Sequence, residues 1–245
     1  MIIASLNNSK VKACSKLKEK KFRDEENSFL IEGDHLVECA LNYGVVKEII
    51  TTDENYKIPH IPVYYVTSSI MKKLSNQVTG TNIIAVCQKI PERQIQGNVC
   101  LLDNIQDPGN LGTIIRSAKA FGIDTLVLSL DTVDLYNDKV IRASEGLLFG
   151  LNIIKSDLKT IIKKLKENNY KIYGTNCKEG LELKKVNFAP LSAIIIGNEG
   201  RGMKPDLTSL CDEMIHIKID GESLNAAVAA SIIFYEVKNG KRVNE

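Results

Sequence analysis

The sequence lacks any uninterrupted apolar stretch of the roughly 18 residues that a transmembrane helix needs. Its opening, MIIASLNNSKVK, also lacks the basic and then apolar order of a secretory signal peptide. These two absences argue against a membrane-spanning or secreted class, so we expect a cytoplasmic protein with no membrane partner. The 245 residues, 44% of them hydrophobic and 25% charged, suffice for one large domain or two small ones.

Paired cysteines and clustered histidines are also missing. The six cysteines are scattered without a CxxC pair, and the three histidines stand apart from one another. This spacing argues against a structural zinc site, and a cytoplasmic location argues against disulfides. We therefore expect no metal and six reduced thiols, most of them packed as small apolar groups.

Net charge is only +2, whereas a strong polyanion binder is usually more basic overall. The basic residues are nevertheless concentrated, because seven of them lie between Lys10 and Arg23 with Glu19 as the one acidic residue. Such a stretch can contact phosphates. A solvated helix face, the more common role of a charge run, also explains it.

The chain divides into two parts with different patterns. Up to about residue 90 short strands and helices alternate irregularly, as in a small α/β unit, and the polar segment KIPERQIQGN, residues 89–98, is the best linker candidate. Beyond it, apolar strands alternate with helices, which predicts a parallel sheet covered on both faces. We expect one domain over residues 1–95 and a second over residues 96–245.

The first stretch that can carry chemistry is DNIQDPGNLGTIIRSAKAFG, residues 103–122, which follows the strand VCLLD. Pro108 and Gly109 predict a turn, and Asn110 is placed to cap the next helix. Arg116 falls outside the apolar stripe of that helix. It is therefore free to face a site, although an ordinary surface arginine would look the same.

The second stretch is AIIIGNEGRGM, residues 193–203, in which three glycines surround Glu199. Their spacing, GxxGxG, differs from the GxGxxG of a Rossmann turn, and no Lys-Ser or Lys-Thr pair completes a P-loop. The turn can approach a ligand closely. A tight strand-to-helix connection would use the same glycines.

The third stretch is IKIDGESLNAAVAASIIFYE, residues 217–236. Ser223 predicts an N-cap for a helix that starts at Leu224 and is apolar almost all round, as buried helices are. The start of such a helix offers unpaired N–H groups to a ligand. Simple capping explains Ser223 well and Asn225 less well, because asparagine disfavours early helix positions unless it is hydrogen-bonded.

Together these stretches resemble the motifs of the SpoU (TrmH) family of RNA ribose methyltransferases, within the SPOUT superfamily. NLGTIIRSAKAFG resembles its first motif, IIIGNEGRGM its second and SLNAAVAASIIFYE its third, while KVIRASEGLLFG resembles the segment between the first two. The match covers roughly residues 99–240. The N-terminal part, with FLIEGDHLVECAL, is similar to the small ribosomal-protein-like RNA-binding domain that often precedes this catalytic domain.

The resemblance implies an α/β fold, in which a C-terminal SPOUT domain with a parallel sheet and a deep trefoil knot follows the small α/β RNA-binding domain. It also implies a homodimer and S-adenosyl-L-methionine as the cofactor. The residues that match the family's polar set, and are therefore expected to be catalytic, are Asn110, Arg116, Glu199, Ser223 and Asn225. Those expected to hold the cofactor are Thr175, Gly197, Ile217 and Leu224.

The implied reaction is transfer of a methyl group to a ribose 2′-hydroxyl in structured RNA, with ribosomal RNA as first choice of substrate and tRNA as second. Arg116 would act as the base or anchor a neighbouring phosphate, and physical chemistry favours the anchor because arginine rarely loses its proton. Three alternatives stay open: a catalytically inactive RNA-binding protein, an antibiotic-resistance methylase acting on ribosomal RNA, and a nicotinamide or flavin oxidoreductase. The wrong glycine spacing counts against the last.

Overall fold

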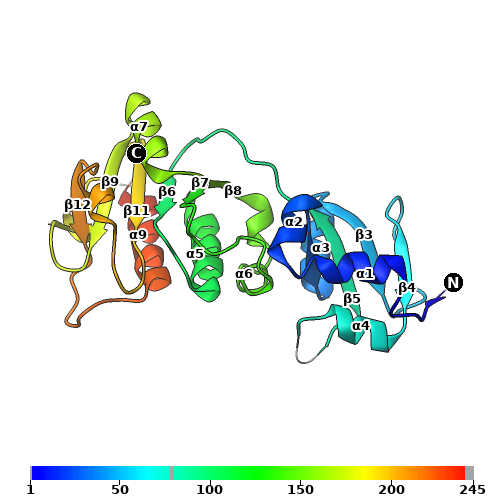
Figure 1. Ribbon diagram of the computed structural model, residues 1–245. Helices are drawn as coiled ribbons and strands as arrows, with labels where there is room; N and C mark the ends of the chain where they lie inside the picture. The colour runs from blue at the N-terminus through cyan, green and yellow to red at the C-terminus, as the bar shows by residue number, and fades with distance from the viewer. Residues whose placement is uncertain (1, 78–79, 241–245) are drawn as a thin grey trace. The chain divides into compact units, whose positions relative to one another are not determined.

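The computed structural model describes residues 2–77 and 80–240, which divide into two compact units (Figure 1). The first unit runs to Pro91 and also takes in Asp134–Phe149, while the second takes in Glu92–Val133 and the chain from Gly150 onward. The predicted linker, residues 89–98, carries no helix or strand. The sequence did not predict that Asp134–Phe149 belongs to the first unit, because the chain on both sides of this segment belongs to the second.

The first unit contains a mixed five-stranded sheet in the order β1-β4-β3-β5-β2. Strands β2 and β3 are antiparallel to β5, whereas β4 is parallel to β3 and to β1. The strands are β1 (Ile2–Ile3), β2 (Ser28–Glu32), β3 (Val46–Thr51), β4 (Val63–Val66) and β5 (Ile83–Gln88). The helices of this unit are α1 (Ser9–Lys16), α2 (Lys20–Glu25), α3 (Asp34–Asn42), α4 (Ser68–Leu74) and α6 (Asp138–Ala143). The 3-10 turn η1 (Leu147–Gly150) follows α6, and its last residue belongs to the second unit.

The basic stretch near the N-terminus forms two short helices, α1 and α2. Helix α1 ends at Lys16, and the chain is extended at Glu19 before α2 begins. The Arg23 guanidinium donates hydrogen bonds to the carbonyls of Leu17 (3.0 Å) and Lys18 (2.6 Å). These carbonyls follow the end of α1, so Arg23 satisfies groups that would otherwise need a continuing helix.

The second unit contains seven strands in the order β10-β12-β9-β11-β6-β7-β8, every neighbouring pair parallel. The predicted parallel sheet is therefore confirmed. The strands are β6 (Val99–Leu102), β7 (Thr125–Leu128), β8 (Asn152–Lys155), β9 (Lys171–Asn176), β10 (Leu181–Glu182), β11 (Ser192–Ile196) and β12 (Glu213–His216). The helices are α5 (Pro108–Phe121), α7 (Leu158–Glu167), α8 (Pro205–Thr208) and α9 (Ala226–Gly240), with the 3-10 turn η2 (Leu183–Lys185).

Both faces of this sheet are covered. Helix α7 buries Leu158, Ile161, Ile162 and Leu165, spaced to lie on one helix face, in a cluster with Val99 and other alternate strand residues. Side chains alternate across a strand, so the neighbouring Cys100 points to the opposite face, where it too is fully buried. Helices α5 and α9 pack against each other, and their serines, Ser117 and Ser231, share a hydrogen bond of 2.6 Å.

The predicted cap of α5 is wrong. Asp107, not Asn110, caps α5: its carboxylate accepts the Asn110 N–H at 2.8 Å, and Pro108 is the first helical residue instead of part of a turn. The fixed φ of proline suits that position, where no N–H bond is needed. Gly122 ends α5 in the left-handed conformation, with a φ of +76°, which glycine adopts without strain.

All six cysteines are free thiols, and Cys14, Cys87 and Cys100 are buried. Burial raises the pKa of the Cys14 thiol to about 12, so this group stays protonated at neutral pH. Within residues 2–77 and 80–240, no helix combines the length and hydropathy that crossing a membrane requires.

Candidate functional site

A cleft opens in the second unit beside the carboxyl ends of β9, β11 and β12 and the start of α9. Its empty volume is about 1230 Å³, part of which is open to solvent. All four residues expected to hold a cofactor line this cleft, as do Glu199 and Ser223 from the polar set. Carboxyl ends of parallel strands are where open α/β sheets bind ligands. The four expected cofactor residues in its wall are Thr175, Gly197, Ile217 and Leu224.

The glycine turn forms one wall of the cleft because its backbone folds tightly on itself. Asn198 and Gly202 exchange two backbone hydrogen bonds of 3.0 Å, as in a small antiparallel bridge. A Cβ atom built on Gly197 would lie 2.4 Å from the carbonyl carbon of Gly202 and from the Met203 nitrogen. No side chain fits in that space, so Gly197 is required for the backbone approach itself.

Asn198 organises this turn from inside, a role that the sequence did not indicate. Its Oδ1 accepts the backbone N–H groups of Gly200 (3.0 Å) and Arg201 (3.1 Å), and its Nδ2 donates to the Asn104 carbonyl (2.7 Å). The first two bonds form an Asx-type turn, and the third ties the turn to the loop after β6. The position of Asn198 between Gly197 and Gly200 is the one feature of the sequence that could have indicated this turn.

Three polar side chains from separate motifs form one hydrogen-bonded chain. Asn110 Nδ2 donates to Glu199 Oε1 at 2.9 Å, and Asn225 Nδ2 donates to Asn110 Oδ1 at 2.9 Å. Glu199 also accepts a hydrogen bond from Asn198 Nδ2 at 3.2 Å. The arrangement fixes which way each amide faces, because the Asn110 oxygen is oriented to Asn225 and its nitrogen to the carboxylate.

The start of α9 differs from the prediction. The helix begins at Ala226, and Asn225 caps it, because Asn225 Oδ1 accepts the N–H groups of Ala227 (2.9 Å) and Val228 (3.3 Å). Ser223 is therefore not the cap, and it lies exposed in the cleft wall. Asn225 thus serves two purposes at once, since its oxygen caps the helix while its nitrogen holds Asn110.

Arg116 is not brought into this chain. It lies six residues after Asn110 on α5, about 9 Å further along the helix axis at 1.5 Å per residue, and its side chain is exposed. Within the described part of the chain, no hydrogen bond or ion pair joins it to another residue. Its guanidinium is consequently available to a partner from outside.

Thr175, at the end of β9, is held in place from two sides. Its Oγ1 donates to the Ile195 carbonyl at 2.9 Å, and its backbone N–H points to Met203 Sδ at 3.1 Å. Met203 also lines the cleft, so this contact connects the far end of the glycine turn to β9. The sequence offered no sign of the methionine's role.

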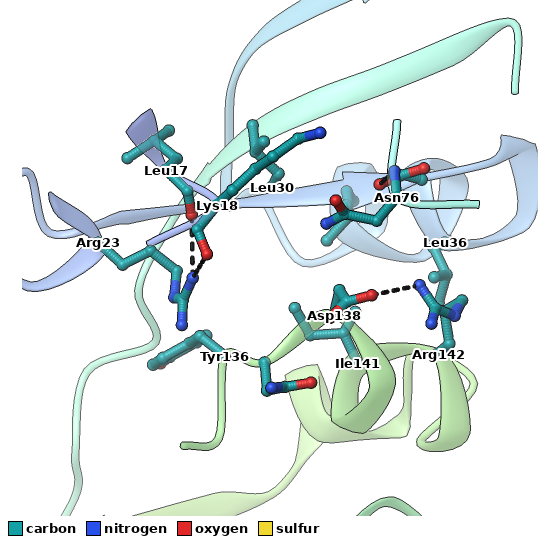
Figure 2. A pocket seen from close by; sticks show the side chains of 13 residues that line it. Leu17, Lys18, Arg23, Leu30, Leu36, Asn76, Tyr136, Asp138, Ile141 and Arg142 are labelled. Atoms are coloured by element: carbon teal, nitrogen blue, oxygen red, sulfur yellow. Dashed lines mark hydrogen bonds and ion pairs between the residues drawn. The ribbon is translucent and has the colours of Figure 1, made fainter. Parts of the chain in front are cut away.

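The first unit contains a smaller pocket, with an empty volume of about 480 Å³ that is partly open to solvent, in which the basic stretch meets the segment around α6 (Figure 2). Arg23 lines it but is only 7% exposed, and its guanidinium is held by two backbone carbonyls and by Asp134 at 2.5 Å. Figure 2 shows the guanidinium beside Tyr136. Arg23 is therefore a buried anchor for the inserted segment.

The other basic residues of this stretch divide into paired and unpaired groups. Lys10 forms an ion pair of 2.7 Å with Glu48, and Lys20 pairs with Asp24. Lys18 donates to backbone carbonyls. Fewer than seven basic side chains of this stretch are therefore available to bind an external anion. Lys12 and Lys16 are exposed and have no carboxylate close by.

The cleft has the composition that a nucleoside-like ligand requires. Apolar side chains such as Ile217 and Leu224 can cover a flat heterocycle, and the glycine turn presents peptide groups at close range. Glu199 adds a carboxylate at the edge. Among the described residues, no group of three or more His, Cys, Asp or Glu side chains is placed to hold a metal ion.

Two family models match the chain. The model of the SpoU rRNA Methylase family matches residues 97–235, and that of the MRM3-like substrate binding domain matches residues 8–85. The 23S rRNA (guanosine(2553)-2′-O)-methyltransferase RlmP of Bacillus subtilis is 39% identical over 246 residues, covering 96% of this chain and 98% of the relative.

Solved structures show the same architecture. The AdoMet-bound rRNA methyltransferase from Sinorhizobium meliloti is 25% identical, with a TM-score of 0.87 over 98% of this chain and 97% of that one. An RNA 2′-O ribose methyltransferase is 27% identical, with a TM-score of 0.83 over 99% of this chain and 100% of that one. The similarity therefore extends over both units.

Proposed function

The chain belongs to the SpoU rRNA methylase family, and on that premise we propose that it transfers a methyl group from S-adenosyl-L-methionine to a ribose 2′-hydroxyl in structured RNA. Ribosomal RNA is the favoured substrate, since RlmP, similar over nearly the full length, acts on 23S rRNA. The observation that carries the proposal is the hydrogen-bonded chain Glu199–Asn110–Asn225, which joins three separate motifs beside the cleft.

The cleft would hold the cofactor, which supplies an activated methyl group. Ile217 and Leu224 would cover its adenine, and the backbone at Gly197, which lines the cleft, would contact its polar parts. Thr175, fixed by two contacts, would support the same wall. Positioning of two reactants can lower a barrier by about 7–11 kcal/mol, which is the main contribution we assign to this wall.

The polar chain would orient the ribose hydroxyl. Asn110 and Asn225 are held by each other and by Glu199, so they need no rearrangement when RNA arrives. Ser223, exposed in the cleft wall, would add a further hydrogen bond. The hydroxyl proton leaves as the O–CH₃ bond forms, and it would pass to a phosphate oxygen or to water.

Arg116 would bind a phosphate next to the reacting ribose. An arginine keeps its proton at any physiological pH, so it is a poor base and a good anchor. Its exposed side chain, without a protein partner in the described residues, fits that role.

The domain roles follow the two family models. We propose that residues 1–95 form the RNA substrate-binding domain and residues 96–245 the methyltransferase domain. We also propose a trefoil knot, supported by the path of the chain. After β11 it passes β9 to reach β12, and it then returns to pack α9 on α5.

We propose that the active protein is a homodimer. Helix α9 exposes Val228 (47%), Ile232 (36%) and Tyr235 (52%), spaced to form one apolar stripe, and Tyr235 packs edge-on against Phe121 of α5. An apolar stripe of this kind marks an interaction surface. Replacing Ile232 with Asp should halve the mass measured by light scattering, and an unchanged mass would remove α9 from the interface. We also propose a cytoplasmic location, supported by the similarity to a bacterial enzyme that acts on ribosomal RNA.

The test is transfer of tritium from labelled S-adenosyl-L-methionine to in vitro transcripts of 23S rRNA, 16S rRNA and tRNA. We expect label in 23S rRNA, at a position that becomes resistant to alkaline hydrolysis on its 3′ side, as a 2′-O-methyl group requires. Label in tRNA alone would select the tRNA alternative. Binding of the cofactor without label in any RNA would favour an inactive RNA-binding protein.

A further inference from the structure

The glycine turn is held at both ends by one residue, Asp103, which directly follows β6. The backbone N–H of Asp103 donates to the Ile196 carbonyl at 2.9 Å, where the turn leaves β11. Its Oδ2 accepts the backbone N–H of Lys204 at 2.8 Å, where the turn ends. The residues between these two points, from Gly197 to Met203, line the cleft.

The side chain of Lys204 returns to the same carboxylate. Its Nζ lies 3.3 Å from Asp103 Oδ1 and 2.7 Å from Asp131 Oδ2. Asp103 is only 1% exposed, and among the described residues its Oδ1 accepts no hydrogen bond, so the ammonium is the charge that balances it. The hydrogen bond to Asp131 raises the pKa of Lys204, and Lys204 in turn lowers the pKa of Asp131.

Asp131 is also fixed in place. Its Oδ1 accepts the Ser129 hydroxyl at 2.6 Å, and Ser129 Oγ accepts the backbone N–H of Asn104 at 2.8 Å. Asn104 is the residue whose carbonyl holds Asn198. Lys204 thus closes a ring of contacts that runs from the end of β6, through the end of β7, to the end of the glycine turn.

We propose that Lys204 is a positioning residue, which keeps the glycine turn in the conformation that binds the methyl donor. This inference rests on the proposed function of the cleft. Lys204 does not line that cleft, so it acts through the backbone of the turn. If the turn were ordered in only a fraction of the molecules before binding, the apparent dissociation constant for the donor would equal the intrinsic one divided by that fraction.

If the contact between Lys204 and Asp131 were an ordinary surface ion pair, its loss would not change the binding of the methyl donor. The Lys204 and Asp131 side chains are 46% and 47% exposed, and such pairs usually contribute little. Lys166 and Asp212 form an equivalent pair at 2.6 Å, with exposures of 40% and 37%, and neither residue lines the cleft. Lys166→Met is therefore the matched control.

The experiment measures the dissociation constant for S-adenosyl-L-methionine by calorimetry, and KM and kcat for methyl transfer to 23S rRNA transcripts. In Lys204→Met we expect the dissociation constant and KM for the donor to rise about three- to ten-fold, with kcat within about two-fold of wild type. Lys204→Arg keeps the positive charge and should restore most of the affinity. Lys166→Met should match wild type.

A double-variant cycle checks the route of the effect. Asp131→Asn should weaken donor binding in the same direction, and Lys204→Met with Asp131→Asn should cost less than the sum of the two. Thermal melting of each variant separates a displaced turn from an unfolded unit. Unchanged donor affinity in a folded Lys204→Met protein, or an equal loss in Lys166→Met, would overturn the inference. A wild-type protein that binds no donor would instead overturn the proposed function.

Discussion

Asn225 donates a side-chain hydrogen bond to Asn110 over 2.9 Å, although the two residues are 115 positions apart in the sequence. The same asparagine caps α9 with its oxygen. One side chain therefore caps the start of α9 and orients a neighbouring amide. The two roles use different atoms, so they can be separated by substitution.

Asn225→Asp should keep the helix cap and lose the bond to Asn110, because a carboxylate accepts from Ala227 N–H but has no proton to donate. We expect the melting temperature to stay close to wild type while kcat falls at least about ten-fold. Asn225→Ala should lose both, including about 0.5–2 kcal/mol of stability from the cap. Equal melting temperatures for the Asp and Ala variants would contradict the capping role, and full activity of Asn225→Asp would contradict the orienting role.

Arg116→Ala should reduce methyl transfer by about 100-fold or more, the usual loss when one group that stabilises a transition state is removed. Binding of S-adenosyl-L-methionine should be nearly unchanged, because Arg116 does not line the cleft. Single-turnover kinetics and calorimetry measure the two effects separately. Wild-type turnover in this variant would exclude Arg116 from the mechanism.

Gly197→Ala and Gly200→Ala form a matched pair within one turn. A Cβ at Gly197 would meet backbone atoms at 2.4 Å, whereas at Gly200 its nearest neighbour would be Asn198 Oδ1 at 3.8 Å. We expect Gly197→Ala to lose about 1–3 kcal/mol of unfolding free energy, as overpacked sites do, together with donor binding. Gly200→Ala should remain stable. Denaturant titrations measure the difference, and comparable stabilities would show that the turn is looser than its geometry indicates.

The basic stretch should respond differently at its buried and exposed positions. Arg23→Met should destabilise the first unit by about 3–5 kcal/mol, because the carboxylate of Asp134 loses its partner. Replacing Lys12 and Lys16 with alanine should leave stability unchanged and should flatten the salt dependence of RNA binding. Filter binding over a range of salt concentrations tests this. An unchanged salt dependence of RNA binding would show that these lysines belong to an ordinary solvated surface.

Much of the fold could be predicted because its strands are short apolar runs bounded by polar turns, and β6 and β11 are examples. Helix starts were harder. Ser223 and Asn225 are both good caps, and the choice between them depends on the tertiary bond to Asn110, which local sequence does not contain. Likewise Asp107 caps α5 because Pro108 fixes the first helical position, so Asn110 falls inside the helix.

The cleft residues were predicted from motifs, whereas their supports were not. Lys204 lies 101 positions after Asp103, and neither residue type stands out in its segment. Met203 and Asn198 act through contacts to backbone groups, which leave little trace in composition. Long-range pairs of this kind depend on how strands are ordered in the sheet, and hydrophobic periodicity does not encode that order.

The inserted segment, Asp134–Phe149, has a consequence for biosynthesis. Arg23 and Phe29, made early, find their partners in Asp134 and Tyr136, which leave the ribosome more than a hundred residues later. By then β6, α5 and β7 have also been translated. The first unit is thus completed only after synthesis of the second has begun. Until Tyr136 is made, the apolar surface around Phe29 lacks this packing partner and is open to unwanted association.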